Sequence, residues 1–231
     1  MTDNFPRDVL ASALFGSSAR EEADESSDVD ILAVVSATTL ARFRELQVVI
    51  AERFTCQTED VSIYTTSACE RMAAQGAPFM HHLASEAIIL YDPTGFLKTC
   101  LDKLRPFSGY AGQLLTYLSL LGLVEENLQS DFGLTECDLH QLHMLKRNTC
   151  ILLCLQKGES RFGRLSPISH AKELYPQIPL REGDLSLSPW ALTYSRNAPT
   201  PEQFPSKREQ ADQVQVVIHL IAFAKEVLDE A

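Results

Sequence analysis

The apolar periodicity of this chain changes once, near residue 92, and this change constrains the fold more than any other feature. Before that point, short apolar runs of strand length are separated by helical stretches. After it, every periodic segment has the spacing of a helix. This order of elements indicates an α+β domain followed by an all-helical domain. The turn signal Asp92-Pro93 places the predicted boundary between residues 1–93 and residues 94–231.

Four strands and one long helix are predicted in the first domain. The strands are residues 11–15, 28–35, 58–64 and 87–91. The second of these is apolar on both faces after its first three residues, and the third alternates between apolar and polar positions. The helix is predicted over 40–54, where apolar residues form one stripe: Leu40, Phe43, Leu46, Val49, Ile50 and Phe54.

Three apolar stripes predict the helices of the second domain. They consist of Leu114, Leu115, Leu118, Leu121 and Val124, then Leu139, Leu142, Leu145, Leu152 and Leu155, then Val214, Val217, Ile218, Ile221 and Val227. The stretch 177–205 is rich in proline and is predicted to be irregular. His140 and His143 are spaced for a metal site, but a solvated helix face is the favoured interpretation. Lys146 and Arg147 could face a cleft, but a solvated helix face is again the favoured interpretation.

Charge and composition exclude several classes of protein. The formal net charge of −11 opposes long-range attraction to polyanions, so binding to bulk nucleic acid is not expected. The chain begins with a polar, acidic segment rather than a secretory signal, and no apolar run reaches the roughly 20 residues of a membrane span. The six cysteines form no CxxC pair and are expected to be reduced. A cytoplasmic protein is therefore predicted.

The most informative segment contains a Gly-Ser turn and a pair of acids. Gly16 and Ser17 follow the first predicted strand, and Asp28 and Asp30 open the second. Because side chains alternate along a strand, the two carboxylates point to the same face and repel each other. A cation between them would relieve the repulsion, and Mg²⁺ is a hard cation that shares carboxylates with substrate phosphates. The pair therefore predicts a magnesium site.

The Gly-Ser turn predicts a phosphate site beside that cation. Gly16 has no Cβ, so a ligand can approach its backbone closely. Ser18 and Glu21 have the spacing of a capping box, and a helix that starts here would direct free N–H groups at an anion. Arg20 could reach a triphosphate or pair with a nearby acid. Phosphate donors beside a metal-binding acid pair are what phosphoryl or nucleotidyl transfer requires.

Asp60 is the third candidate carboxylate of the site. In the predicted strand 58–64, Val61 and Ile63 face the core together with Glu59, which places Asp60 on the polar face. If this strand pairs with strand 28–35, Asp60 lies near the acid pair. There it could share the metal or accept the proton of an attacking hydroxyl.

These motifs resemble those of the DNA polymerase β-like nucleotidyltransferase superfamily. The matching residues are Phe15-Gly16-Ser17, Asp28-Val29-Asp30-Ile31 and Asp60-Val61-Ser62-Ile63. A weaker resemblance, over Glu70–Pro93 and Arg147–Pro179, is to aminoglycoside adenylyltransferases of the streptomycin/spectinomycin type. Together the resemblance covers most of the chain, but only the first motif is sharp.

The resemblance implies a fold and a mechanism. It implies a small mixed sheet with helices on one face, followed by a helical bundle. It also implies that Asp28 and Asp30 bind Mg²⁺ and that Asp60 acts as the base. ATP, or another nucleoside triphosphate, is expected to bind with its phosphates over Gly16 and Ser17, near Ser18 and Arg20.

The acceptor of the AMP group is left open by the sequence. A small hydroxylated molecule, such as an aminoglycoside, is favoured because a helical domain in the same chain can enclose a pocket. Transfer to a protein partner is the first alternative. The second is a catalytically idle nucleotide-binding or antitoxin-like module, against which the three intact acids argue.

Overall fold

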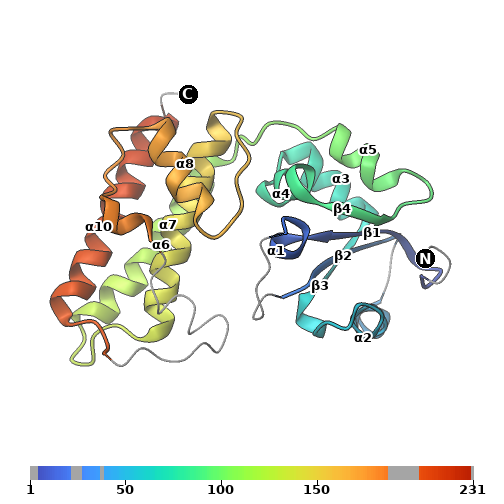
Figure 1. Cartoon of the computed structure of the whole chain (residues 1–231), viewed down its shortest axis with the longest axis horizontal. Helices are drawn as coiled ribbons and strands as arrows, with labels where there is room; N and C mark the ends of the chain where they lie inside the picture. Colours follow the sequence, from blue (N-terminus) through green and yellow to red (C-terminus); the bar gives the residue numbers. More distant parts are fainter. Residues whose placement is uncertain (1–4, 22–27, 37–38, 187–202, 230–231) are drawn as a thin grey trace. The chain divides into compact units, whose positions relative to one another are not determined.

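The computed structural model describes residues 5–21, 28–36, 39–186 and 203–229 of the chain. The chain divides into two compact units, Met1–Ser108 and Gly109–Ala231 (Figure 1). The first unit combines strands with helices, and the elements described in the second unit are all helices. The predicted α+β class with a C-terminal helical domain is therefore confirmed.

A four-stranded sheet forms the centre of the first unit. Its strands are β1 (Val9–Phe15), β2 (Asp30–Val35), β3 (Val61–Thr65) and β4 (Ile88–Tyr91), in the spatial order β3-β2-β1-β4. β1 is antiparallel to β2 and β4, whereas β2 and β3 are parallel, so the sheet is mixed as predicted. β2 and β3 each start later than expected, and residues 58–60 form a 3₁₀ turn, η1 (Thr58–Asp60), instead of strand.

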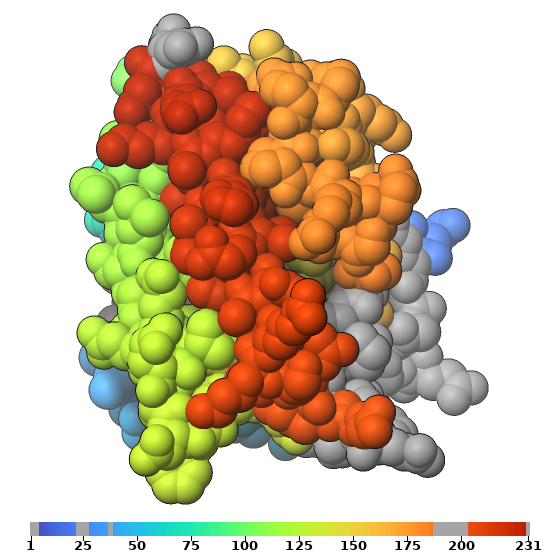
Figure 2. Space-filling view, turned by 90° about the vertical axis from the view of Figure 1, so that its left-hand side faces the viewer, coloured from blue at the N-terminus to red at the C-terminus, as the bar shows by residue number. Residues whose placement is uncertain are grey.

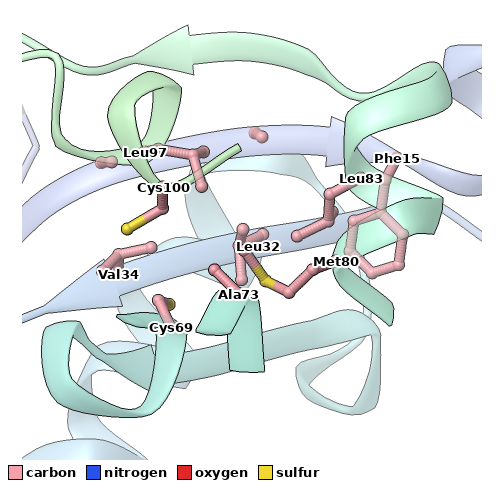
Figure 3. Packing of buried hydrophobic residues seen from close by; sticks show 11 residues of the cluster. Phe15, Leu32, Val34, Cys69, Ala73, Met80, Leu83, Leu97 and Cys100 are labelled. Atoms are coloured by element: carbon pink, nitrogen blue, oxygen red, sulfur yellow. The ribbon is translucent and has the colours of Figure 1, made fainter. Parts of the chain in front are cut away.

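Helices cover both faces of this sheet, so the expectation that they cover one face is wrong. α2 (Leu40–Phe54) packs Leu46 and Ile50 against one face. The opposite face is covered by α3 (Thr66–Gln75), α4 (Pro78–Glu86) and α5 (Phe96–Asp102), whose side chains enclose Leu32 and Val34 (Figure 3). The physical reason is that β2 is apolar on both faces, and each face must be removed from water.

The first unit extends beyond the predicted boundary at residue 93. α5 lies in this unit because Leu97 and Cys100 are buried in the same core cluster as Met80 and Leu83 of α4. The division found in the structure therefore falls between Ser108 and Gly109. The turn at Asp92-Pro93 ends β4 but does not end the domain.

Polar caps fix where the helices of the first unit begin and end. The Thr39 hydroxyl accepts a hydrogen bond from the backbone N–H of Arg42 at the start of α2, and Thr65 does the same for Ala68 at the start of α3. Such caps stabilise a helix by about 1 kcal/mol. α3 ends at Gly76, whose φ of 63° lies in the left-handed region that favours glycine.

The second unit is a helical bundle. Its described elements are α6 (Tyr110–Gln129), α7 (Glu136–Gln156), α8 (Ser166–Leu174), η2 (Glu182–Leu185) and α10 (Lys207–Asp229). α7 is the central helix, with an uninterrupted buried run from Thr149 to Leu155. Figure 2 shows α10 in red between α6 in green and the orange segment that includes α8. A capping box between Thr135 and Asp138 fixes the start of α7.

The apolar stripes are confirmed only in part. Leu114, Leu121 and Val124 of α6 are buried, but Leu115 is 65% exposed and Leu118 is 42% exposed. The predicted irregular stretch lies partly outside the described residues, at 187–202. Within the described part of the chain, no helix is both long enough and apolar enough to cross a membrane.

Candidate active site

The candidate residues gather at one edge of the sheet because of strand direction and register. β1 ends at this edge, where Phe15 pairs with Asp30 at the start of β2. In the parallel ladder Ile31 pairs with Val61, so Asp30 and Asp60 are each one residue nearer the same edge. Gly16, Asp30 and Asp60 therefore follow one another across three neighbouring strands, β1, β2 and β3.

Gly16 occupies a position that tolerates no side chain. Its φ is +73°, in the left-handed region, and an added Cβ would lie 2.1 Å from Oδ2 of Asp30. The Asp30 carboxylate thus packs directly against the backbone of the Gly-Ser turn. Gly16 and Ser17 are both buried in the short helix α1 (Gly16–Ala19). The Gly-Ser turn and the start of β2, which are separated in sequence, are in contact in the fold.

Asp30 has an unfavourable electrostatic environment. Burial raises its pKa above the ordinary value, and the negative charges of Asp28 and Asp60 raise it further. The positive charges of His82 and Arg20 oppose this rise without cancelling it. Asp28 and Asp60 are therefore close enough to Asp30 to interact with its charge. Asp28 is exposed, whereas Asp30 and Asp60 are half-buried.

Asp60 does not lie on a strand, and in this respect the prediction is wrong. It is the last residue of η1, and its Oδ2 accepts a hydrogen bond of 2.9 Å from the backbone N–H of Gln57. The alternation of apolar and polar residues extends to positions before the true start of β3, so it gave no indication of the turn at residues 58–60. Because η1 leads directly into β3, Asp60 still lies at the predicted edge of the sheet, next to the start of β2.

Ser18 and Arg20 make contacts that were not predicted from the sequence. α1 begins at Gly16, with Phe15 as its N-cap, so Ser18 does not open the helix. Its hydroxyl instead donates to the backbone oxygen of Asp28 at 3.0 Å, which ties the turn to the start of the acid strand. Arg20 pairs with Glu86, at 2.6 Å between Nη1 and Oε1, and this partner was not anticipated.

Glu86 is the residue of this edge that sequence reasoning missed. Leu14 pairs with Ile88 in the β1–β4 ladder, and continuing this antiparallel register brings Glu86 opposite Gly16. One oxygen, Oε1, accepts hydrogen bonds from Gly16 N at 2.9 Å, Arg20 Nη1 at 2.6 Å and His82 Nε2 at 2.6 Å. The four-residue spacing of His82 and Glu86 on α4 was visible in the sequence, but its link to the turn depends on strand pairing.

The pKa of Glu86 is lowered, opposite to that of Asp30. Burial acts to raise it, but the hydrogen bonds from His82 and Arg20, together with their positive charges, outweigh burial. With its side chain 8% exposed, Glu86 is a buried and well-compensated carboxylate. Its partners come from α1 and α4, so it joins two elements at the edge.

The chemistry of the carboxylates fits a hard cation that is shared with a ligand. In the described part of the chain, no three His, Cys, Asp or Glu side chains already form a metal-binding cluster. Mg²⁺ does not need one, because it is commonly held by one or two carboxylates, waters and substrate phosphates. Asp28 and Asp30 would supply the protein oxygens, and a cation would stabilise the ionised form of Asp30, which burial and the charges of Asp28 and Asp60 disfavour.

The titratable residues noted in the helical domain belong to the second unit and are far from these acids in sequence. His143 is buried, and burial together with the charges of Lys146 and Arg147 lowers its pKa to about 4. Lys146 donates from Nζ to the backbone oxygen of Asp184 at 2.7 Å. Both line a cavity of about 410 Å³ between α7 and α10. The prediction that they form a solvated face is wrong, because this part of α7 is covered by η2 and α10.

Comparison with known proteins finds one matching family model and similar solved structures. Residues 1–62 match the family model described as the nucleotidyltransferase domain. No curated protein sequence matches the chain. Spectinomycin adenyltransferase AAD(9) from Enterococcus faecialis, solved with ATP and spectinomycin, is similar in structure, with a TM-score of 0.51 and 14% sequence identity. That match covers 94% of this chain and 92% of the other.

A second solved structure, a toxin–antitoxin with AMP-PNP, matches 53% of this chain and 90% of the other at 18% identity, with a TM-score of 0.30. The family model spans the Gly-Ser turn, the acid pair and Asp60, which are the residues that carried the resemblance. The match to AAD(9) extends the similarity of fold across both units. Residues 1–62 thus match a nucleotidyltransferase domain, and the chain as a whole shares its fold with the spectinomycin adenyltransferase AAD(9).

Proposed function

We propose that this nucleotidyltransferase moves AMP from ATP to a hydroxyl of a small acceptor molecule, with Mg²⁺ held by Asp28 and Asp30 and with Asp60 as base. The observation that carries the proposal is the gathering of Asp30, Asp60 and the Gly16 turn at one sheet edge. The raised pKa of Asp30 adds support, because burial, followed by the negative charges of Asp28 and Asp60, disfavours its ionised form, which a cation would stabilise. A cation and a phosphate chain would complete such a site.

Each residue of the edge has a definite part in the proposed reaction. The backbone of Gly16 and Ser17 lies against Asp30 and forms the surface on which the phosphates would rest. Ser18 holds Asp28 in place through the backbone of that residue. Mg²⁺, when bound, would neutralise phosphate charge and orient the triphosphate for in-line attack.

Asp60 would receive the proton of the acceptor. Its Oδ2 is oriented by the backbone N–H of Gln57, which fixes the carboxylate at the end of η1. As the acceptor oxygen forms its bond to the α-phosphorus, the bond between that phosphorus and the bridging oxygen breaks, and pyrophosphate leaves. The hydroxyl proton passes to Asp60. Positioning and electrostatic stabilisation supply the rate, because the protein forms no covalent bond.

A small acceptor is favoured over a protein partner by the length of the structural match. AAD(9), a spectinomycin adenyltransferase by name, matches this chain over both units, the helical one included. A hydroxylated aminoglycoside-like molecule is therefore the first class of acceptor to test. A protein acceptor and an idle nucleotide-binding module remain as outcomes of that test.

The test is a transfer assay with labelled ATP, Mg²⁺ and a panel of hydroxylated small molecules that includes aminoglycosides. We expect label to move to at least one acceptor and pyrophosphate to appear. Transfer to a co-purified protein would favour the protein partner instead. ATP binding without transfer to any acceptor would favour the idle module. Label transfer that Asp60→Asn leaves unchanged would remove Asp60 from the mechanism.

A matched assay tests the metal assignment. The double substitution Asp28→Ala with Asp30→Ala removes both proposed Mg²⁺ ligands. We expect Mg²⁺-dependent ATP binding to be lost in this variant. A control with Glu52→Gln, an exposed acid on α2, is expected to bind like the wild type. Unchanged affinity of the double variant for ATP in Mg²⁺ would contradict the assignment.

A further inference from the structure

The Glu86 carboxylate joins three parts of the sheet edge. It accepts hydrogen bonds from the turn at Gly16, from Arg20 after α1 and from His82 one helical turn earlier on α4. All three donors converge on the single atom Oε1. Charge-assisted hydrogen bonds of this kind are the short and strong ones.

This carboxylate is shielded from solvent along with its partners. The side chain of Glu86 is 8% exposed, and those of Arg20 and His82 are each 18% exposed. Solvent screening, which makes most surface ion pairs weak, is therefore reduced here. Removing the negative charge would leave two donor side chains with a poorer acceptor in a place where water cannot fully replace it.

Arg20 connects Glu86 to the acid cluster. Its positive charge acts on Asp30, since it lowers the pKa that burial and the neighbouring acids raise. His82 acts on Asp30 in the same direction. Both basic side chains thus pair with Glu86 and interact with the charge of Asp30, and the ion pair with Glu86 helps to hold Arg20 in place. Through Gly16 N, the same carboxylate also holds the turn against which Asp30 packs.

We infer that Glu86 is a positioning residue for nucleotide binding: its carboxylate holds Arg20 and the Gly16 turn in the arrangement that receives the phosphates. This inference rests on the proposed function. Glu86 itself touches neither the nucleotide nor the reacting atoms. Its action runs through Arg20 and the turn, whereas a purely structural Glu86 would affect only the stability of the fold.

The test is a double-mutant cycle on ATP affinity with Glu86→Gln, Arg20→Met and the two combined. Glutamine keeps the size of the side chain and an acceptor oxygen but removes the charge. We expect Glu86→Gln to weaken ATP binding in Mg²⁺ by about tenfold, and the double variant to bind no more weakly than Arg20→Met. Glu70→Gln, an exposed acid on α3, is the matched control and is expected to bind like the wild type.

Two results would overturn the inference. One is a Glu86→Gln variant with lowered thermal stability but unchanged ATP affinity, which is the signature of a structural role alone. The other is strict additivity of the two substitutions, which would mean that Glu86 does not act through Arg20.

A second measurement separates failure of the inference from failure of the proposed function. Amide hydrogen exchange of residues 16–20 in the nucleotide-free protein reports the turn directly. We expect faster exchange there in Glu86→Gln than in the wild type and in Glu70→Gln, and unchanged exchange would overturn the inference. If the wild type does not bind ATP at all, the proposed function fails, and the role of Glu86 in holding the turn is decided by exchange alone.

Discussion

The two halves of the candidate sheet edge hold carboxylates in opposite electrostatic situations. On the β2–β3 half, Asp30 lies near Asp28 and Asp60, and its pKa is raised. On the β1–β4 half, Glu86 accepts three hydrogen bonds, and its pKa is lowered although burial acts to raise it. A cluster of under-compensated acids destabilises a fold unless something cationic binds there. The β2–β3 half is thus suited to a ligand, and the β1–β4 half is a scaffold.

The largest effect on the β2–β3 half is expected from Asp60→Asn. This substitution keeps the shape of the side chain but removes the proposed proton acceptor. The turnover rate is expected to fall by about 10² to 10⁴, the usual contribution of a general base. The ATP dissociation constant should change little. The measurement is steady-state transfer kinetics beside a binding titration, with the exposed neighbour substituted as Glu59→Gln for comparison. A rate close to that of the wild type would assign the base elsewhere.

Gly16→Ala is expected to disturb both halves together. The new Cβ would lie 2.1 Å from Oδ2 of Asp30, and the backbone is in the left-handed region. Because the turn also donates to Glu86, the two halves would be displaced relative to each other. We expect a loss of about 1–3 kcal/mol in unfolding free energy, together with loss of ATP binding.

Gly122→Ala is the matched control for that substitution. Gly122 lies inside α6, where an added Cβ meets nothing within 4 Å. Alanine there should be neutral or stabilising by up to about 1 kcal/mol. Chemical denaturation measures both variants. A Gly16→Ala protein as stable as the wild type would mean that the contact between the turn and Asp30 is easily relaxed.

Neutralising one acid on each half should change stability in opposite directions. Asp30→Asn removes an under-compensated charge and is expected to raise the melting temperature of the ligand-free protein, by about 2–4 °C if the gain is near 1 kcal/mol. Glu86→Gln removes a compensated charge and is expected to lower it. Differential scanning calorimetry without Mg²⁺ or ATP measures both. Destabilisation by both substitutions would erase the contrast between the halves.

The same contrast predicts a small pH effect with a definite sign. The pKa of Asp30 is raised from 3.8. Ionisation of Asp30 therefore does not lower the free energy of unfolding below pH 3.8, and it does so increasingly as the pH rises through the folded-state pKa. The pKa of Glu86 is lowered from 4.5, so its contribution is present above pH 4.5 and is lost as the pH falls through its folded-state value. The stability gain of Asp30→Asn should therefore vanish in acid.

Melting curves of the wild type and Asp30→Asn across this pH range test the sign. A gain that stayed constant down to pH values below 3.8 would show that it does not come from ionisation of Asp30. For Glu86→Gln, the loss of stability should persist at neutral pH and shrink only in the more acid part of the range. These measurements need no substrate.

The β2–β3 half was accessible to sequence reasoning because its signals are local. The Gly-Ser turn directly follows β1 and Asp30 opens β2, so their closeness could be predicted from the strand pattern, whereas Asp28 lies before the true start of β2 and strand alternation does not apply to it. The continuous apolar run of β2 also indicated burial on both faces, although helices were expected on only one. Alternation failed at Asp60, since it cannot show where a strand gives way to a 3₁₀ turn.

The β1–β4 half could not be predicted in the same way. Glu86 lies 70 residues from Gly16 and 66 from Arg20, and only the register of β1 with β4 brings them together. No local pattern encodes such a register. The boundary at residue 93 was missed for a related reason, because α5 joins the first core through contacts with β1, α3 and α4 rather than through a sequence signal.

The account depends most directly on a divalent cation at the acid pair. The decisive measurement is a crystal structure with a non-hydrolysable ATP analogue and Mn²⁺ in place of Mg²⁺, in which anomalous scattering locates the ion. The account predicts an anomalous peak within bonding distance of the Asp28 and Asp30 carboxylates, with the phosphates against the Gly16 turn. A bound nucleotide with no peak there, or with the ion held by other side chains, would contradict it.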